Sequence, residues 1–273
     1  MAQLGNHADT KLEENLVRYM ILNKIRVIRQ QFSGDIVIAC DGKNTWRRQC
    51  FPYYKAKRRS ERKSSEFNWN AIYDVLNKVR DELKENFSYI VIHIDGAEAD
   101  DIIASLVMKH SLNINNTIGQ EVEPIVIISG DKDFVQLQKY PNVEQYCSIK
   151  GKAIKENNPV DFVKRHIIKG DKGDGVPNVL SDDDSYVNGS RQKKITENFI
   201  VNFDYEKQPE AIQRNYKRNE LLIDLHNVPA DIQEKTVSIY NEEKKTSPIR
   251  RQRMFNYFIS KKLKNFMENV GEF

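Results

Sequence analysis

The sequence predicts an α/β fold in which a parallel sheet flanked by helices precedes an all-helical half. Short apolar runs rich in β-branched residues alternate with segments of helical periodicity, and these runs lie at residues 36–40, 89–94 and 125–128. Continuous apolar strands that alternate with helices are typical of a parallel sheet covered on both faces. From about residue 159 onward the apolar spacing is helical only. We therefore expect a domain at residues 1–158 and a second, helical domain at 159–273.

The expected elements begin or end at recognisable residues. Thr10 and Glu13 form a capping box in front of apolar residues at helical spacing, which predicts an amphipathic helix over residues 10–30. The same spacing predicts further helices over residues 67–83, 99–107, 162–168, 195–200 and 255–263. The polar stretch 180–191 is expected to be a solvated loop.

Charge and cysteine content limit the class of protein. Of 273 residues, 43 are basic and 39 acidic, and a net charge of +4 is only a weak indication of an anionic partner. Three widely spaced cysteines without a C-x-x-C pair, together with five scattered histidines, argue against a zinc ribbon and favour reduced thiols. The sequence shows no apolar signal segment and no run long enough to span a bilayer, so we expect a soluble cytoplasmic protein that binds no membrane.

Acidic residues recur at the ends of the expected strands and in a glycine-rich turn. Functional groups of parallel sheets gather at the carboxyl ends of the strands, so these acids are expected to converge. The candidate metal ligands are Asp41, Glu98, Asp101, Asp131, Asp133, Asp171 and Asp174. For any one of them, a helix N-cap is the better interpretation, and it is their combination that predicts a site.

Crowded carboxylates stay ionised only when cations neutralise them. Oxygen ligands without histidine or cysteine suit Mg²⁺ or Mn²⁺, and two such ions can activate water and stabilise the leaving oxygen of a phosphodiester. An EF-hand at Asp171 is excluded because Gly173 and Gly175 occupy two of its ligand positions.

The segment 43–63 combines nine basic residues with a single acid, Glu61. Its basic residues alone would be read as a solvated loop. Aromatic rings change this interpretation, because bases stack on rings while Arg and Lys hold phosphates. The interleaved rings are those of Trp46, Phe51, Tyr53 and Tyr54.

A glycine-rich segment, residues 170–178, predicts a tight turn between two helices. Exposed backbone amides in such a turn can hold a phosphate without reading sequence. The alternative is an ordinary helix connection, and Lys169 and Lys172 favour phosphate binding only modestly.

Three motifs in this order resemble the acidic signatures of the 5′-nuclease family. They read Ile-Asp-Gly-Ala-Glu98-Ala-Asp-Asp101, Ser-Gly-Asp131-Lys-Asp133-Phe and Gly-Asp171-Lys-Gly-Asp174-Gly-Val-Pro. The family includes flap endonucleases, the 5′-nuclease domain of bacterial DNA polymerase I and, with the greatest likeness, the ribonuclease H of T-even phages. Trp46-Arg-Arg48 and Tyr53-Tyr-Lys55 are similar to its helical arch, and the likeness runs from about residue 10 to the C-terminus.

The resemblance implies a PIN-like nuclease domain, a helical arch and a helix–turn–helix element that binds duplex. It implies a 5′–3′ exonuclease and flap endonuclease with ribonuclease H activity, which removes RNA primers and adjacent DNA in replication. The implied substrates are RNA–DNA hybrid and flap or 5′-ended duplex DNA. The implied setting is the cytoplasm of the host cell of a phage.

The resemblance also implies residue roles. Asp41, Glu98, Asp101 and Asp131 would surround a first Mg²⁺. Asp133, Asp171 and Asp174 would serve a second, with Mn²⁺ able to substitute. Arg47 and Lys55 would act on the scissile phosphate, with Tyr54 stacking on a base. The implied nucleic-acid-binding residues are Arg48, Lys57, Arg58, Gly170, Lys172, Gly173, Gly175 and Asn178.

One departure from the family concerns its first strand, which ends in a catalytic Asp. The acid that precedes the first expected helix, Asp9, has no strand in front of it and reads as part of the helix cap. We therefore expect weak or absent catalysis with retained nucleic-acid binding, and we expect an upstream extension to restore activity.

Alternative functions remain open at this level. One is a catalytically defective, structure-selective nucleic-acid-binding protein. Another is a metal-dependent phosphatase for small molecules, which would explain the acids but not the basic aromatic segment. The chain is expected to be a monomer. Its aromatic C-terminus, residues 265–273, either packs on the helical half or docks a sliding clamp or single-strand-binding protein.

Overall fold

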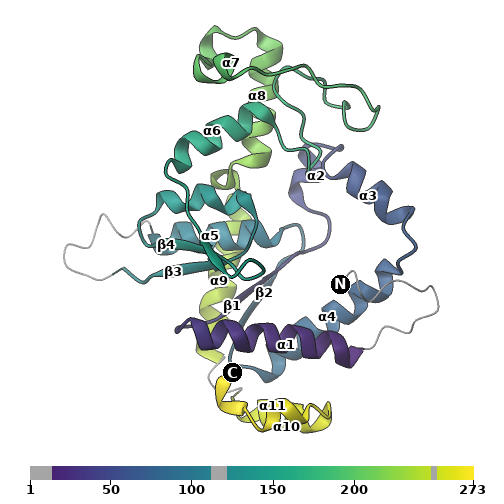
Figure 1. Ribbon diagram of the computed structural model, residues 1–273, viewed down its shortest axis with the longest axis vertical. Helices are drawn as coiled ribbons and strands as arrows, with labels where there is room; N and C mark the ends of the chain where they lie inside the picture. Colours follow the sequence, from purple (N-terminus) through teal and green to yellow (C-terminus); the bar gives the residue numbers. More distant parts are fainter. Residues whose placement is uncertain (1–13, 112–121, 247–250) are drawn as a thin grey trace. The chain divides into compact units, whose positions relative to one another are not determined.

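The computed structural model describes residues 14–111, 122–246 and 251–273 (Figure 1). The chain forms two compact units, each assembled from segments that lie apart in the sequence. Unit 1 consists of Met1–Cys40, Arg62–His93 and Ser238–Phe273, and unit 2 consists of Asp41–Glu61 and Ile94–Val237. The capping box expected at Thr10 and the cap at Asp9 lie outside the described residues.

Unit 1 contains two of the predicted strands and the first long helices. Helices α1 (Glu14–Gln31) and α4 (Trp69–Asn86) confirm the expected amphipathic segments. Strands β1 (Val37–Cys40) and β2 (Ile90–His93) pair in parallel along their whole length. The C-terminal elements are α10 (Arg251–Ser260), α11 (Lys264–Met267) and the 3-10 helix η7 (Val270–Glu272).

The C-terminal aromatic residues belong to the core of unit 1. Phe87, Phe258 and Phe266 are buried together with aliphatic residues of α1 and α4. Phe273 packs on this cluster, with its ring centroid 5.2 Å from that of Phe258 and 5.3 Å from that of Phe266. The C-terminal rings therefore pack against α1 and α4, not on the helical half alone as expected, and the docking of a partner stays a prediction.

Unit 2 contains the remaining strands. Helix α5 (Ala99–Ser111) precedes β3 (Ile125–Ile128), and the 3-10 helix η3 (Lys132–Lys139) leads into β4 (Val143–Cys147) and β5 (Lys152–Ile154). Strand β4 lies in the middle, parallel to β3 and antiparallel to β5. The helix α5 and the strand β3 confirm predictions, whereas β4 and β5 were not predicted.

The other elements of this part of the chain are helical, as expected. The basic segment contains α2 (Trp46–Cys50) and α3 (Ala56–Lys63), as the predicted arch requires. After β5 follow α6 (Pro159–Lys169), α7 (Glu197–Val201), η4 (Tyr205–Lys207), α8 (Glu210–Ile223), η5 (Leu225–Asn227) and α9 (Ala230–Thr246). The glycine turn follows α6 directly, but no helix begins again until Glu197, so the expected helix–turn–helix contains a long connection.

Two expectations about the whole chain can be compared with the structure. None of the three cysteines forms a disulfide. Within the described ranges, no helix combines the length and the apolar character needed to cross a bilayer.

Candidate active site

The loop after β3 presents Asp131 and Asp133. Asp131 is the N-cap of η3, and its Oδ1 accepts a hydrogen bond from the Asp133 amide at 3.1 Å. The buried Gln145 of β4 donates its side-chain Nε2 to the carbonyl oxygens of Ser129 at 3.0 Å and Asp131 at 2.6 Å. A buried amide that satisfies two carbonyls fixes the backbone that carries them. Gln145 therefore positions the loop.

Helix α5 presents Asp100 from its first turn. Asp100 lines the same cavity as Asp131 and Asp133. Burial raises the pKa of Asp100 to about 7, and the Asp131 and Glu98 carboxylates act in the same direction against Lys55. A cation bound nearby would stabilise the ionised form of a carboxyl group in this position.

Asp101, in contrast, lies behind the cavity wall. It is fully buried, and its Oδ2 accepts hydrogen bonds from the indole N–H of Trp46 at 3.1 Å and from the Glu98 amide at 2.9 Å. Its Oδ1 lies 2.7 Å from a guanidinium nitrogen of Arg47. Asp101 thus reaches back to Glu98, the residue that precedes the helix, as in a capping box, and the prediction that it binds a metal ion is corrected in favour of Asp100.

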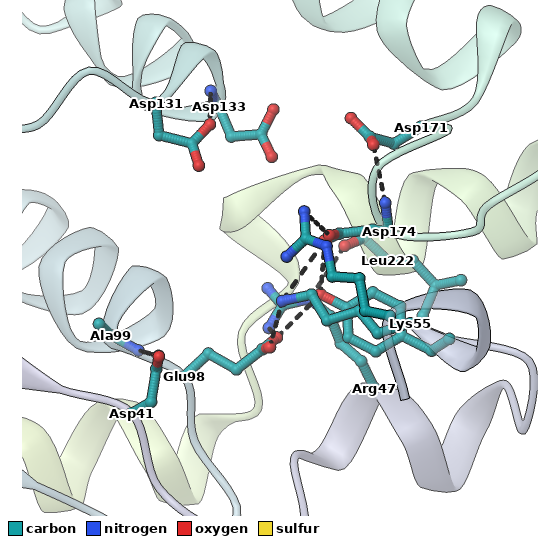
Figure 2. A network of polar contacts seen from close by, with 12 residues as sticks. Asp41, Arg47, Lys55, Glu98, Ala99, Asp131, Asp133, Asp171, Asp174 and Leu222 are labelled. Atoms are coloured by element: carbon teal, nitrogen blue, oxygen red, sulfur yellow. Dashed lines mark hydrogen bonds and ion pairs between the residues drawn. The ribbon is translucent and has the colours of Figure 1, made fainter. Parts of the chain in front are cut away.

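Asp41 has a comparable structural role. Its Oδ1 accepts a hydrogen bond from the amide of Ala99, the first residue of α5, at 2.9 Å. Figure 2 shows Asp41 beside Ala99 and away from Asp131, Asp133 and Asp171. The first amides of a helix have no partner within it, so this contact stabilises the start of α5. Asp41 is not among the residues that line the cavity, and its predicted metal binding stays a prediction.

The glycine turn after α6 presents Asp171 and Asp174. The backbones of Asp171 and Val176 form two hydrogen bonds of 2.8 Å, which close the turn. Asp171 also accepts a hydrogen bond from the Asp174 amide at 2.9 Å, so the two carboxylates are held in a fixed relation (Figure 2). Gly170 and Gly175 have φ values of +69° and +71°, which L side chains rarely adopt.

Gly170→Ala is expected to destabilise the protein by about 2–4 kcal/mol, because the turn tolerates no side chain there. An added Cβ would lie 2.4 Å from the Val176 carbonyl oxygen, and the φ of +69° and ψ of 178° suit glycine alone. Gly189→Ala is the matched control, since φ is +68° but nothing lies within 4 Å of the added Cβ. Urea denaturation should show a distinctly smaller decrease in the free energy of unfolding for Gly189→Ala than for Gly170→Ala. Equal losses would contradict the packing described for the turn.

These segments meet at one acidic cavity of about 160 Å³. The residues that line the acidic cavity are Lys55, Arg58, Asp100, Asp131, Lys132, Asp133, Asp171, Gly173 and Asp174. The acids come from the start of α5, the loop after β3 and the glycine turn, all within unit 2. Four of the predicted ligands, namely Asp131, Asp133, Asp171 and Asp174, are thus brought together as expected.

The carboxyl groups of the cavity differ in their pKa values. Burial raises the pKa of Asp133 to about 6, and Asp131 and Asp171 act in the same direction. Burial would also raise the pKa of Asp171, but hydrogen bonds from His166 and Lys132 hold that pKa well below its usual range. The cavity therefore combines protonatable and firmly ionised carboxyl groups.

Two family models match successive parts of the chain. The 5′–3′ exonuclease N-terminal resolvase-like domain matches residues 4–166, and the C-terminal domain of T4 RNase H matches residues 158–273. The chain belongs to the 5′–3′ exonuclease family. A curated ribonuclease H from Enterobacteria phage T4 is 34% identical over 281 residues, which cover 96% of this chain and 88% of that relative.

Solved structures show the same fold as this exonuclease-family chain. A phage T5 protein co-crystallised with metal ions has a TM-score of 0.61 at 18% identity, and the match covers 83% of this chain and 92% of that one. A bacteriophage T5 flap endonuclease crystallised with DNA and metal ions has a TM-score of 0.59 at 17% identity, with 88% and 94% covered. These similarities support the PIN-like α/β fold.

In this member of the 5′–3′ exonuclease family, the basic segment 43–63, called the arch below, contributes Lys55 and Arg58 to the cavity wall. The Lys55 ammonium lies 2.6 Å from Glu98 Oε1 and 3.7 Å from Asp174 Oδ2 (Figure 2). Arg58 lies 3.2 Å from Asp174 Oδ1. Although burial alone would lower it, the Asp174 and Glu98 carboxylates raise the pKa of Lys55. Both cations can therefore meet an anionic substrate at the acids.

Arg47 and Tyr54 lie deeper than predicted. Arg47 is 2% exposed and donates to Glu98 Oε2 at 3.0 Å and to the Leu222 carbonyl at 2.9 Å. The Tyr54 ring is 3% exposed and belongs to a hydrophobic cluster, while its hydroxyl lies 2.9 Å from Glu98 Oε2 and 2.8 Å from Asp174 Oδ2. A buried ring cannot stack on a base, and a buried guanidinium cannot reach a substrate phosphate in this arrangement.

Glu98 is the common partner of these residues. Its carboxylate accepts hydrogen bonds from the side chains of Arg47, Tyr54 and Lys55, and Glu98 is 8% exposed. Burial would raise the pKa of Glu98, but Lys55 and Arg47 outweigh it and lower the pKa. The predicted metal ligand Glu98 therefore already has its charge balanced by the arch.

The predicted nucleic-acid-binding residues differ in accessibility. Arg48, Lys57 and Lys172 are exposed, as this role requires. Asn178 is buried, donates its Nδ2 to the Lys193 carbonyl at 2.8 Å, and accepts from the Leu180 amide at 3.0 Å. Asn178 therefore holds the chain after the turn together, and its predicted contact with nucleic acid is corrected.

Sequence reasoning missed His166 and Lys132. His166, near the end of α6, lies 2.8 Å from Asp171 Oδ2, and the Lys132 ammonium lies 2.7 Å from the same oxygen. The available signal for His166 was its position near the end of an expected helix, beside the apolar Ile167 and Ile168 and just before the glycine turn. The histidines were treated as scattered because their spacing in sequence does not reveal contact in the fold.

Proposed function

We propose that this chain is a divalent-metal-dependent nuclease that hydrolyses phosphodiester bonds at the acidic cavity. Its activity would be that of a 5′–3′ exonuclease and flap endonuclease that also degrades RNA in RNA–DNA hybrid. The observation that carries the proposal is the convergence of five aspartates from three separate segments, with Lys55 and Arg58 beside them. Neither helix capping nor solvation accounts for acids that face one another across a cavity.

The residues of the cavity fit hard divalent cations. Asp100, Asp131, Asp133, Asp171 and Asp174 offer carboxylate oxygens, the ligand type that Mg²⁺ prefers. Burial, with neighbouring carboxylates, raises the pKa values of Asp100 and Asp133, and a bound cation would favour their ionised forms. Two Mg²⁺ ions, replaceable by Mn²⁺, are expected. When bound, they would activate a water molecule and stabilise the leaving oxygen.

The chain's own residues would bring the substrate to these acids. Lys55 and Arg58, at the cavity wall, would hold the phosphate that is cut and share its negative charge. Arg48 and Lys57 on the arch, and Lys172 in the glycine turn, would bind phosphates further along the strand. In the reaction a water oxygen bonds to phosphorus, the P–O bond to the leaving oxygen breaks, and a proton of the water passes to that oxygen.

The substrates we propose follow the relatives. The phage T4 relative is named ribonuclease H, and the T5 relative was crystallised as a flap endonuclease with DNA. We infer that RNA–DNA hybrid and flap or 5′-ended duplex DNA are substrates, that the chain acts as a monomer in the host cytoplasm, and that it removes RNA primers and adjacent DNA in replication. A sliding clamp or single-strand-binding protein remains a candidate partner, reached through a surface other than the buried C-terminal rings.

A cleavage assay tests the proposal. With 5′-labelled RNA–DNA hybrid, the chain should release short products when Mg²⁺ is present and none after chelation, and Asp131→Ala should abolish release. Asp204→Ala is the matched control, since this half-exposed acid forms its ion pair with Lys207 and does not line the acidic cavity. Salt-sensitive hybrid binding without Mg²⁺-dependent products would favour the alternative, a catalytically defective nucleic-acid-binding protein. If the chain neither binds nor cleaves the hybrid, the proposal is overturned.

A further inference from the structure

A nitrogen ligand stands among the cavity's carboxylates. One potential ligand atom each from Asp133, His166 and Asp171 lies within 4.8 Å of the other two. His166 is 8% exposed and comes from α6, whereas Asp133 and Asp171 come from η3 and the glycine turn. Three elements thus bring two carboxylate oxygens and one imidazole nitrogen close together, whereas the other acids of the cavity, Asp100, Asp131 and Asp174, offer oxygen alone.

Two further observations indicate that this point suits a cation. The Oδ1 atom of Asp133 is buried and has no hydrogen-bond partner, although it lies 3.6 Å from His166 Nδ1. The Lys132 ammonium lies 2.7 Å from Asp171 Oδ2 and 3.3 Å from His166 Nε2. A positive charge is therefore already held between the carboxylate and the imidazole.

The Lys132 side chain is 59% exposed, so it can leave this position without uncovering a core. Lysine carries only donors, and its withdrawal would leave Asp171 Oδ2 and a His166 ring nitrogen available as ligands. Lys132 thus resembles a resident counter-ion that an incoming metal ion would displace.

We propose that Asp133, His166 and Asp171 form a metal site with an imidazole ligand that prefers Mn²⁺ or Co²⁺ to Mg²⁺, and that Lys132 competes for it. The inference rests on the proposed metal-dependent function and assigns a distinct ion preference to one part of the cavity. Imidazole nitrogen suits first-row transition metals, while Mg²⁺ favours oxygen ligands and water. Asp100, Asp131 and Asp174 would remain an oxygen-only set.

Calorimetric titration of the full chain with MnCl₂ and with MgCl₂, without nucleic acid, tests this site. Wild type should show one site that binds Mn²⁺ more tightly than Mg²⁺. His166→Ala should lower the Mn²⁺ affinity of that site by about 10- to 100-fold and the Mg²⁺ affinity much less. Lys132→Ala should raise the affinity for both ions. Titration with Co²⁺ should give a visible absorption band in wild type that weakens in His166→Ala.

Control variants separate the possible outcomes. His226→Ala removes another histidine that contacts an aspartate, Asp224 at 2.8 Å, and should leave both affinities unchanged. His166→Asn, checked for folding by circular dichroism, keeps a polar group and should still lose the Mn²⁺ preference. If Mn²⁺ and Mg²⁺ affinities fall by the same factor, His166 only orients Asp171 and the inference is overturned. If neither ion binds to wild type, the metal dependence in the proposed function fails as well.

Discussion

Asp100→Asn is expected to lower the rate of hybrid cleavage at saturating Mg²⁺ by about a hundredfold or more, since even residues behind the ligands of a metal site change activity by 10- to 100-fold. The same change should leave the free energy of unfolding unchanged or raise it. Burial and neighbouring carboxylates already raise the pKa of Asp100 to about 7, so a neutral amide relieves repulsion.

Asp101→Asn should show the opposite pattern in stability. It removes the charge that faces Arg47 at 2.7 Å in a fully buried position, which costs about 3–5 kcal/mol. Cleavage rates and urea denaturation of both variants give the comparison. An inactive but stable Asp101→Asn beside a fully active Asp100→Asn would restore the original assignment from sequence.

Arg47→Ala is expected to destabilise the protein by about 3–5 kcal/mol, because it leaves buried acids without their counter-charge. Arg47 pairs with Glu98 at 3.0 Å and with Asp101 at 2.7 Å, and it also satisfies the Leu222 carbonyl. Urea denaturation followed by circular dichroism measures the loss.

The neighbouring residue provides the control for this prediction. Arg48 is exposed, so Arg48→Ala should change the free energy of unfolding by less than about 0.5 kcal/mol while weakening the binding of hybrid at low salt. If Arg47→Ala keeps wild-type stability and loses only cleavage, then Arg47 acts on the substrate as the sequence resemblance implied.

Elements with strong local patterns were predictable from sequence. The amphipathic spacing of α1 and α4 and the β-branched runs of β1, β2 and β3 correspond to elements of the structure. Strand β4 was missed because its buried positions are Val143, Gln145 and Cys147, and a buried glutamine gives no apolar signal. The partners that bury Gln145 come from the loop after β3 and are invisible to local reasoning.

The acids show where sequence reasoning about the site ended. Glu98 and Asp101, three positions apart, were expected to share a helix face and bind metal. This spacing also defines a capping contact, and the Asp101 carboxylate indeed accepts the Glu98 amide. Which of two adjacent aspartates faces a cavity depends on where the helix begins, and α5 begins at Ala99. If the helix began one residue earlier or later, the positions of Asp100 and Asp101 relative to the cavity would change.

The aromatic residues of the arch were assigned to the substrate for a similar reason. Rings between basic residues suit nucleic acid, but Phe51 and Tyr54 pack with Ile167 and Leu222 from α6 and α8. Burial of this kind depends on contacts between segments more than a hundred residues apart. The predicted division at residue 158 stays a prediction, as do the individual roles of the cavity residues.

Anomalous diffraction from crystals of the full chain soaked in Mn²⁺ tests most directly whether the aspartates converge to hold divalent ions. We predict ion peaks within about 2.0–2.6 Å of carboxylate oxygens of the cavity, at Asp100, Asp131, Asp133, Asp171 or Asp174. Peaks at Asp41 or Asp101 instead, or no peak in the cavity at saturating Mn²⁺, would contradict this account of the site.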